Sequence, residues 1–150
     1  MIHTRLSNEH DAPVIAEFQI EMAKETEDLD LERTTVADGV FSVFRDPQKG
    51  KYYVATEKDE IVASMLITQE WSDWRNSWVY WLQSVYVIPE KRGLGIFKQM
   101  YEYIRKQVVE SNEVAGIRLY VDMKNSGARK VYTKLGMNGD HYQVFEWMKE

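Results

Sequence analysis

The stretch VYVIPEKRGLGIF, residues 85–97, decides the fold that this sequence predicts. It begins as an apolar segment, passes Pro89 into a basic turn with two glycines, and continues as a run with helical spacing of its apolar residues. This order indicates a strand, a turn and the start of a helix. The N-terminal amides of a helix, together with basic side chains and glycines that allow close approach of the backbone, suit a diphosphate.

A second stretch, NSGARKVYTKLG at residues 125–136, predicts another helix, with Asn125 as its N-cap and Gly136 as its C-cap. Tyr132 lies about two turns after the cap, on or near the same face. A tyrosine is protonated at neutral pH and can donate a proton to a departing thiolate. The same residue also fits the apolar stripe of this helix as a core aromatic, so the residues alone leave both roles open.

The composition narrows the class of protein. With 150 residues, 44% of them hydrophobic, the chain is expected to form one domain over residues 1–150. The net charge of −5 argues against nucleic acid as a partner. There is no cysteine, which excludes disulfides and a thiol nucleophile, and the three histidines show no metal-ligand spacing, so no metal is expected. No run is apolar enough for a signal peptide or a membrane span, which predicts a cytoplasmic protein without a membrane partner.

The hydrophobic pattern along the chain predicts an α/β protein, a mixed sheet with helices on both faces. Helices are expected over residues 14–22, 36–44, 95–108 and 128–135, and residues 71–77 are expected to form a polar, aromatic connection. Strands are expected at residues 2–6, 51–56, 61–68, 78–88, 117–121 and 142–148.

Two known phosphate-binding motifs fit residues 85–97 poorly. The P-loop pattern fails because Lys-Ser/Thr does not follow the second glycine, and the dinucleotide fingerprint fails because it needs a third glycine or alanine. A nucleotide-binding protein is therefore disfavoured.

The two stretches, in this order, resemble the GNAT family of N-acetyltransferases across essentially the whole chain. The family signature Gln/Arg-x-x-Gly-x-Gly/Ala corresponds to residues 92–97, with Phe97 in place of the final small residue. The later family pattern Asn-x-x-Ala-x-x-x-Tyr-x-x-x-Gly-Phe corresponds to residues 125–137, with Met137 in place of Phe.

The resemblance implies the GNAT acyl-CoA N-acyltransferase fold, acetyl-CoA as cosubstrate and an amine as acceptor. Tyr132 would be the general acid for the leaving thiolate, and without a cysteine the amine would attack bound acetyl-CoA directly. Residues implied in binding the cofactor are Val85, Tyr86, Val87, Arg92, Gly93, Leu94, Gly95, Ile96, Phe97, Lys98 and Asn125.

The general base is not given by the resemblance, because many relatives have a glutamate in the central strand where Trp81 or Leu82 stands here. Our hypothesis is that Asp73 or Glu25 binds or deprotonates the acceptor. Further candidates are a water relayed by the central strand, at Gln83 or Ser84, and the carboxylates Glu21, Glu27 and Glu70.

Several readings remain open beside an acetyltransferase. The donor could be a longer acyl-CoA, or the chain could be a catalytically weak acyl-CoA-binding or sensing module. Trp71 and Trp74 could overhang an acceptor cleft that favours an ammonium group, or could form a dimer contact or anchor a loop by packing. A homodimer is left open, and the acceptor amine is not identified by the sequence.

Overall fold

The structure of the chain is a computed structural model that describes residues 1–149. Two compact units make up the chain, Met1–Arg118 and Leu119–Glu150, and each is described by itself. The first unit contains β1 (Ile2–Leu6), α1 (Ala12–Glu27), α2 (Arg33–Arg45), β2 (Lys51–Glu57), β3 (Glu60–Ser72), β4 (Ser77–Val87), α3 (Ile96–Glu110) and β5 (Val114–Arg118). The second unit contains α4 (Ser126–Lys134).

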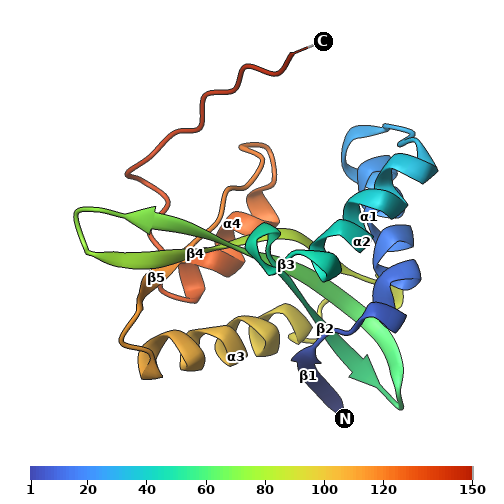
Figure 1. The fold of residues 1–150 in the computed structure, drawn as a ribbon, viewed down its shortest axis with the longest axis horizontal. Helices are drawn as coiled ribbons and strands as arrows, with labels where there is room; N and C mark the ends of the chain where they lie inside the picture. The colour runs from blue at the N-terminus through green and yellow to red at the C-terminus, as the bar shows by residue number, and fades with distance from the viewer. Residues whose placement is uncertain (150) are drawn as a thin grey trace. The chain divides into compact units, whose positions relative to one another are not determined.

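The sheet of the first unit has five strands in the order β1-β2-β3-β4-β5 (Figure 1). Neighbouring strands are antiparallel except β4 and β5, which are parallel and are connected through α3. The sheet is therefore mixed, as the sequence pattern predicts. A two-residue turn joins β2 to β3, and its residues Lys58 and Asp59 have φ values of 50° and 66°, the left-handed backbone that a tight hairpin turn requires.

Helices cover both faces of this sheet, which confirms the prediction. Successive residues of a strand point to opposite faces, and β2 shows this directly. The Tyr52 ring stacks on Phe44 of α2 with centroids 5.8 Å apart, whereas the Tyr53 ring lies 5.9 Å from Tyr103 of α3. The helices α1 and α2 thus pack on one face and α3 packs on the other.

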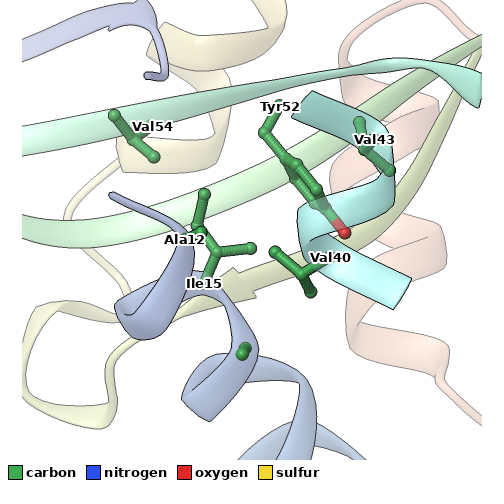
Figure 2. Close-up of a cluster of buried hydrophobic side chains, with 7 residues drawn as sticks. Ala12, Ile15, Val40, Val43, Tyr52 and Val54 are labelled. Atoms are coloured by element: carbon green, nitrogen blue, oxygen red, sulfur yellow. The ribbon is translucent and has the colours of Figure 1, made fainter. Parts of the chain in front are cut away.

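The core beneath α1 and α2 is a cluster of small and branched side chains around one tyrosine. Figure 2 shows Ala12 and Ile15 of α1, Val40 and Val43 of α2, and Tyr52 and Val54 of β2. Tyr52 is buried, and this burial raises its pKa to about 12. The cluster fixes α1 against the sheet, and α1 in turn carries the carboxylates of the candidate site.

A partly buried ion pair holds the start of α1. The guanidinium of Arg5 in β1 donates two hydrogen bonds to the carboxylate of Asp11, at 2.8 and 3.0 Å. The same carboxylate accepts the backbone N–H of Asn8, which closes the first turn. These bonds to the ionised form lower the pKa of Asp11.

The structure corrects three expectations. Trp71 lies within β3 rather than in a connection, because β3 and β4 pair as far as Ser72 and Ser77. The strand expected at residues 117–121 lies at Val114–Arg118, since its pairing with β4 ends at Trp81 and Arg118.

The third correction concerns residues 142–148, which were expected to form a strand and have no regular secondary structure. Their alternation of side chains is compatible with a strand, but a strand also needs a neighbour for its backbone hydrogen bonds. Over residues 1–149, no helix is both long enough and apolar enough to cross a membrane.

Candidate active site

A β-bulge in β4 opens the centre of the sheet. Ser64 of β3 pairs with Tyr86 of β4, and Leu66 of β3 pairs with Gln83 of β4. Between these two pairs, β4 therefore has two residues where β3 has one. One of the two, Ser84, has a φ of 53°, which is unfavourable for a residue other than glycine. The bulge bends β4, as is usual beside functional sites.

The same region of β4 has no strand on its other side. The parallel pairing with β5 includes β4 residues from Trp78 to Trp81 and stops there, whereas β4 continues to Val87. Among the described residues, the last part of β4 therefore has no strand partner on the β5 side. Backbone N–H and C=O groups of residues 83–87 on that side can bond a ligand that lies along the strand.

The turn after β4 leads directly into α3. A short helical turn at Pro89–Lys91 is followed by Gly93 and Gly95, with φ values of 77° and 79°. A Cβ at either glycine would meet no atom within 4 Å, so glycine is required by backbone conformation and the space in front of the turn is open. Gly95 is the N-cap of α3, whose first amides have no intrahelical acceptor.

The signature arginine points away from this turn toward α1. The Nε of Arg92 donates to the carbonyl oxygen of Val87 at 2.8 Å, and its Nη2 donates to Glu25 at 2.7 Å. The guanidinium also lies 5.3 Å from the centre of the Tyr86 ring. Arg92 thus connects the turn to α1, and its backbone N–H donates to the carbonyl oxygen of Pro89 at 3.3 Å, which closes the short helical turn.

An acidic groove borders the end of β4. It has a volume of about 660 Å³, and its lining includes Phe18, Glu21 and Glu25 of α1 together with Tyr86. The hydroxyl of Tyr86 lies 3.0 Å from Oε2 of Glu21 and 3.3 Å from Oε1 of Glu25. Burial, and then the neighbouring Glu21 carboxylate, raise the pKa of Tyr86, so this hydroxyl remains a donor.

The two tentative acceptor residues lie at opposite ends of β4. Glu25 lies beside the end of β4, where Arg92 binds it, whereas Asp73 lies exposed in the turn before β4 begins at Ser77. An 11-residue strand spans about 36 Å. The structure therefore does not bring Asp73 and Glu25 together.

The tryptophans near Asp73 form part of the β3–β4 hairpin. Trp71 and Trp78 are directly opposite on the two strands, and their rings make an edge-to-face contact with centroids 5.0 Å apart. Trp74, in the turn itself, is 89% exposed. Glu70, another candidate base, forms an ion pair with Arg118 of β5.

The second unit carries the other two residues singled out by the sequence. The side chain of Asn125 accepts the N–H of Ala128 at 3.0 Å, which confirms its expected role as the N-cap of α4. Burial raises the pKa of Tyr132, which keeps its hydroxyl protonated at neutral pH. Gly136, with a φ of 89°, follows the end of α4, as a C-capping glycine does.

Sequence reasoning missed the contacts of the Tyr86 side chain and the bulge at Ser84. The four-residue spacing of Glu21 and Glu25 was a usable signal, because it places both carboxylates on one helix face. Ser84 offers no comparable signal, since serine rarely takes a positive φ. Phe97 lies beside Tyr101, with ring centroids 6.2 Å apart.

Comparison with known proteins gives a consistent result. The family model described as Acetyltransferase (GNAT) family matches residues 8–137. A crystal structure described as that of a possible acetyltransferase from Clostridium difficile 630 is 38% identical, with a TM-score of 0.92, over 100% of this chain and 99% of that one. No curated protein sequence matches the chain significantly.

Two more distant structures share the fold alone. A ribosomal-protein-alanine N-acetyltransferase from Brucella melitensis biovar Abortus 2308 is 14% identical, with a TM-score of 0.80, over 99% of this chain and 100% of that one. A predicted acetyltransferase with acetyl-CoA from Clostridium acetobutylicum is 16% identical, with a TM-score of 0.74, over 97% and 96% of the two chains.

Proposed function

Because the chain belongs to the acetyltransferase (GNAT) family, we propose that it transfers the acetyl group of acetyl-CoA directly to an amine within a ternary complex. The observation that carries this proposal is the open edge of β4 next to a glycine turn that begins α3. We take the two compact units as one catalytic domain, since the family model extends over both.

The residues present fit coenzyme A. The amides of residues 93–98, at the positive-φ glycines and the start of α3, would hold the pyrophosphate, for which the space in front of Gly93 and Gly95 is open. Backbone groups of residues 85–87 would bond the pantetheine arm, and Asn125 would bind the pantetheine or phosphate region. When bound, acetyl-CoA supplies a thioester as the activated acetyl donor.

The groove beside β4 is proposed to bind the acceptor. Its carboxylates favour an amine, which is a cation before it reacts, and the buried ring of Tyr86 provides an apolar wall next to them. Glu25 is held by Arg92 and Tyr86, so its position is defined without a ligand. We keep Glu25 as the first candidate to bind or deprotonate the amine, and Asp73 as the second.

The proposed chemistry needs proton transfers at both the nitrogen and the sulfur. The cationic amine loses one proton to a carboxylate or to a water bound by it, its nitrogen lone pair attacks the thioester carbonyl, and the nitrogen loses a second proton to water as the amide forms. The C–S bond then breaks, and the hydroxyl of Tyr132 donates its proton to the thiolate, for which its raised pKa keeps it protonated. Bulk solvent reprotonates Tyr132 after the products leave.

Binding and turnover test the proposal separately. Acetyl-CoA at about 100 times its dissociation constant should stabilise the folded chain by about 2.7 kcal/mol, or roughly 5–10 °C in Tm. A screen of amines that monitors free thiol should then find turnover. No shift in Tm at saturating acetyl-CoA would contradict the proposal. A shift without turnover would favour an acyl-CoA-binding module. Turnover only with longer acyl chains would mean that the donor is a longer acyl-CoA.

Variants assign the roles. Tyr132→Phe should lower kcat by about 100-fold or more and leave the acetyl-CoA shift in Tm unchanged, as expected for a general acid. Glu25→Gln and Asp73→Asn should be assayed in parallel against the same amine. Full activity in both would remove these two carboxylates from the mechanism, and equal activity with neutral or anionic acceptors would remove the preference for an amine.

A further inference from the structure

The side chain of Arg92 bridges two parts of the candidate site that lie far apart in the sequence. Its Nε donates a hydrogen bond to the carbonyl oxygen of Val87, at the end of β4, at 2.8 Å. Its Nη2 donates to Oε2 of Glu25, in α1, at 2.7 Å. In the proposed function the end of β4 bonds the acetyl donor and Glu25 receives the amine, so this one side chain contacts both the donor side and the acceptor side.

The carboxylate of Glu25 is held at both of its oxygens. Its Oε1 accepts a hydrogen bond from the hydroxyl of Tyr86 at 3.3 Å, and its Oε2 accepts the one from Arg92. The Tyr86 ring is buried, lies 5.0 Å from the ring of Phe18, and has the guanidinium of Arg92 5.3 Å from its centre. Because the last torsion of a glutamate is otherwise broadly distributed, these two anchors define the direction of the carboxylate.

An arginine makes this bridge with a fixed spacing that a lysine does not provide. Nε and Nη2 belong to one edge of the planar guanidinium, so the group itself sets the distance between the carbonyl of Val87 and the carboxylate of Glu25. A lysine keeps the charge but places it at a single point on a flexible stem. The side chains of Arg92 and Glu25 are 46% and 38% exposed, and an ion pair this exposed adds little to stability. The bridge is therefore better explained by geometry than by stabilisation of the fold.

We propose that Arg92 is a positioning residue, which sets the place of Glu25 relative to the end of β4 and thereby the place of the amine relative to the thioester. Arg92 acts through Glu25 and does not itself contact the reacting atoms. This role rests on the proposed function, since it concerns the two substrates of that reaction. Attack requires the nitrogen and the carbonyl carbon to lie about 3–3.5 Å apart, and a misplacement of about 1 Å can lower the rate about 100-fold.

The kinetics of Arg92 variants test this role. The full chain is assayed well below its Tm, with acetyl-CoA and the amine that gives the highest turnover in the screen. Arg92→Lys and Arg92→Gln should each lower kcat by about 10- to 100-fold, whereas the Tm shift by acetyl-CoA should stay as in the native chain. A near-native kcat in Arg92→Lys would mean that charge alone suffices, and a lowered Tm without a change in kcat would mean a structural role. Either result would overturn the proposal.

A double-mutant cycle tests whether Arg92 acts through Glu25. The double variant Arg92→Gln with Glu25→Gln should have the kcat of Glu25→Gln alone, because the carboxylate to be positioned is already lost. Losses that multiply, or a smaller Tm shift by acetyl-CoA in Arg92→Gln, would mean that Arg92 acts on the cofactor turn instead, and they would overturn the proposal. Full activity in Glu25→Gln would do the same.

Lys91→Gln is the matched control. Lys91 is the neighbouring basic residue of the same turn, and it forms an ion pair with Glu57 of β2, which does not line the groove. Its kcat should equal that of the native chain, and a loss as large as that of Arg92→Gln would assign the effect to the charge of the turn and overturn the proposal. No turnover of any amine by the native chain would overturn the proposed function, whereas native turnover that the Arg92 variants retain would overturn this role alone.

Discussion

Replacing Tyr86 by phenylalanine removes one hydroxyl from the centre of the candidate site and leaves its packing unchanged. The Tyr86 ring is 4% exposed, lies 5.0 Å from the ring of Phe18, and is covered on another side by Arg92. Its hydroxyl is the described donor that reaches both Glu21 and Glu25. The Tyr86→Phe variant therefore isolates the hydrogen bond to these carboxylates.

The expected loss follows from the type of bond. A hydrogen bond to a charged acceptor contributes about 1.5–3 kcal/mol, and the lower value applies here because exposed carboxylates can bind water instead. For a chain of this length, about 1.5 kcal/mol corresponds to roughly 3–6 °C in Tm. Since the raised pKa of Tyr86 keeps it protonated, stability from this bond is present below the ordinary tyrosine pKa of about 10 and is lost only above it.

Thermal unfolding by circular dichroism at pH 6, 7.5 and 9 measures this loss, which should be the same at all three values. Tyr101→Phe is the control, because Tyr101 is buried to a similar extent in α3 and no hydrogen bond from its hydroxyl is described. A cycle of Tyr86→Phe with Glu21→Gln should give non-additive losses. A change below 1 °C, or one equal to that of the control, would refute the described hydrogen bond.

Three further outcomes are expected from single residues. Ser64→Ala should raise the free energy of unfolding, measured in urea, by about 1 kcal/mol, because the fully buried Ser64 hydroxyl has no hydrogen-bond partner among the described residues. The control Ser72→Ala should show no such gain, because it loses a hydrogen bond donated by an arginine. Because the pKa of Asp11 is lowered in the folded state, its ion pair with Arg5 stabilises the fold fully above about pH 4, and this stability is lost as the pH falls through the folded pKa. In Asp11→Asn, the free energy of unfolding should therefore depend less steeply on pH in that range. Gly95→Ala should cost about 1–2 kcal/mol, because its φ is 79°, and should weaken the Tm shift by acetyl-CoA; an unchanged shift would remove this turn from the cofactor site.

Much of the fold follows from local rules that can be applied to the sequence directly. Pro89 ends the central strand, and the four-residue spacing of Ile96, Met100 and Ile104 places all three on the buried face of α3. Glycine at positions 93 and 95 indicates a special backbone, and both residues have positive φ. These predictions hold because each depends on neighbours within one or two turns of the chain.

Features that depend on distant partners were not predictable in the same way. The bulge at Ser84 depends on how β3 and β4 align, and the end of β5 depends on where β4 bends away from it. Residues 142–148 have the alternation of a strand, yet they cannot themselves supply the neighbouring strand that their backbone hydrogen bonds need. Likewise, the sequence suggests both Asp73 and Glu25 for the acceptor, and only the structure shows that they lie at opposite ends of β4.

The sequence by itself determined the family, the order of most strands and helices, and the glycine turn before α3, since these depend on residue type and short-range spacing. Only the tertiary structure decided where the side chains of that turn are directed. It binds Arg92 to Glu25 and to the carbonyl of Val87, and it places Tyr86 between α1 and the sheet. The physical reason is that each of these contacts joins segments far apart in the chain, which come together only when the core packs.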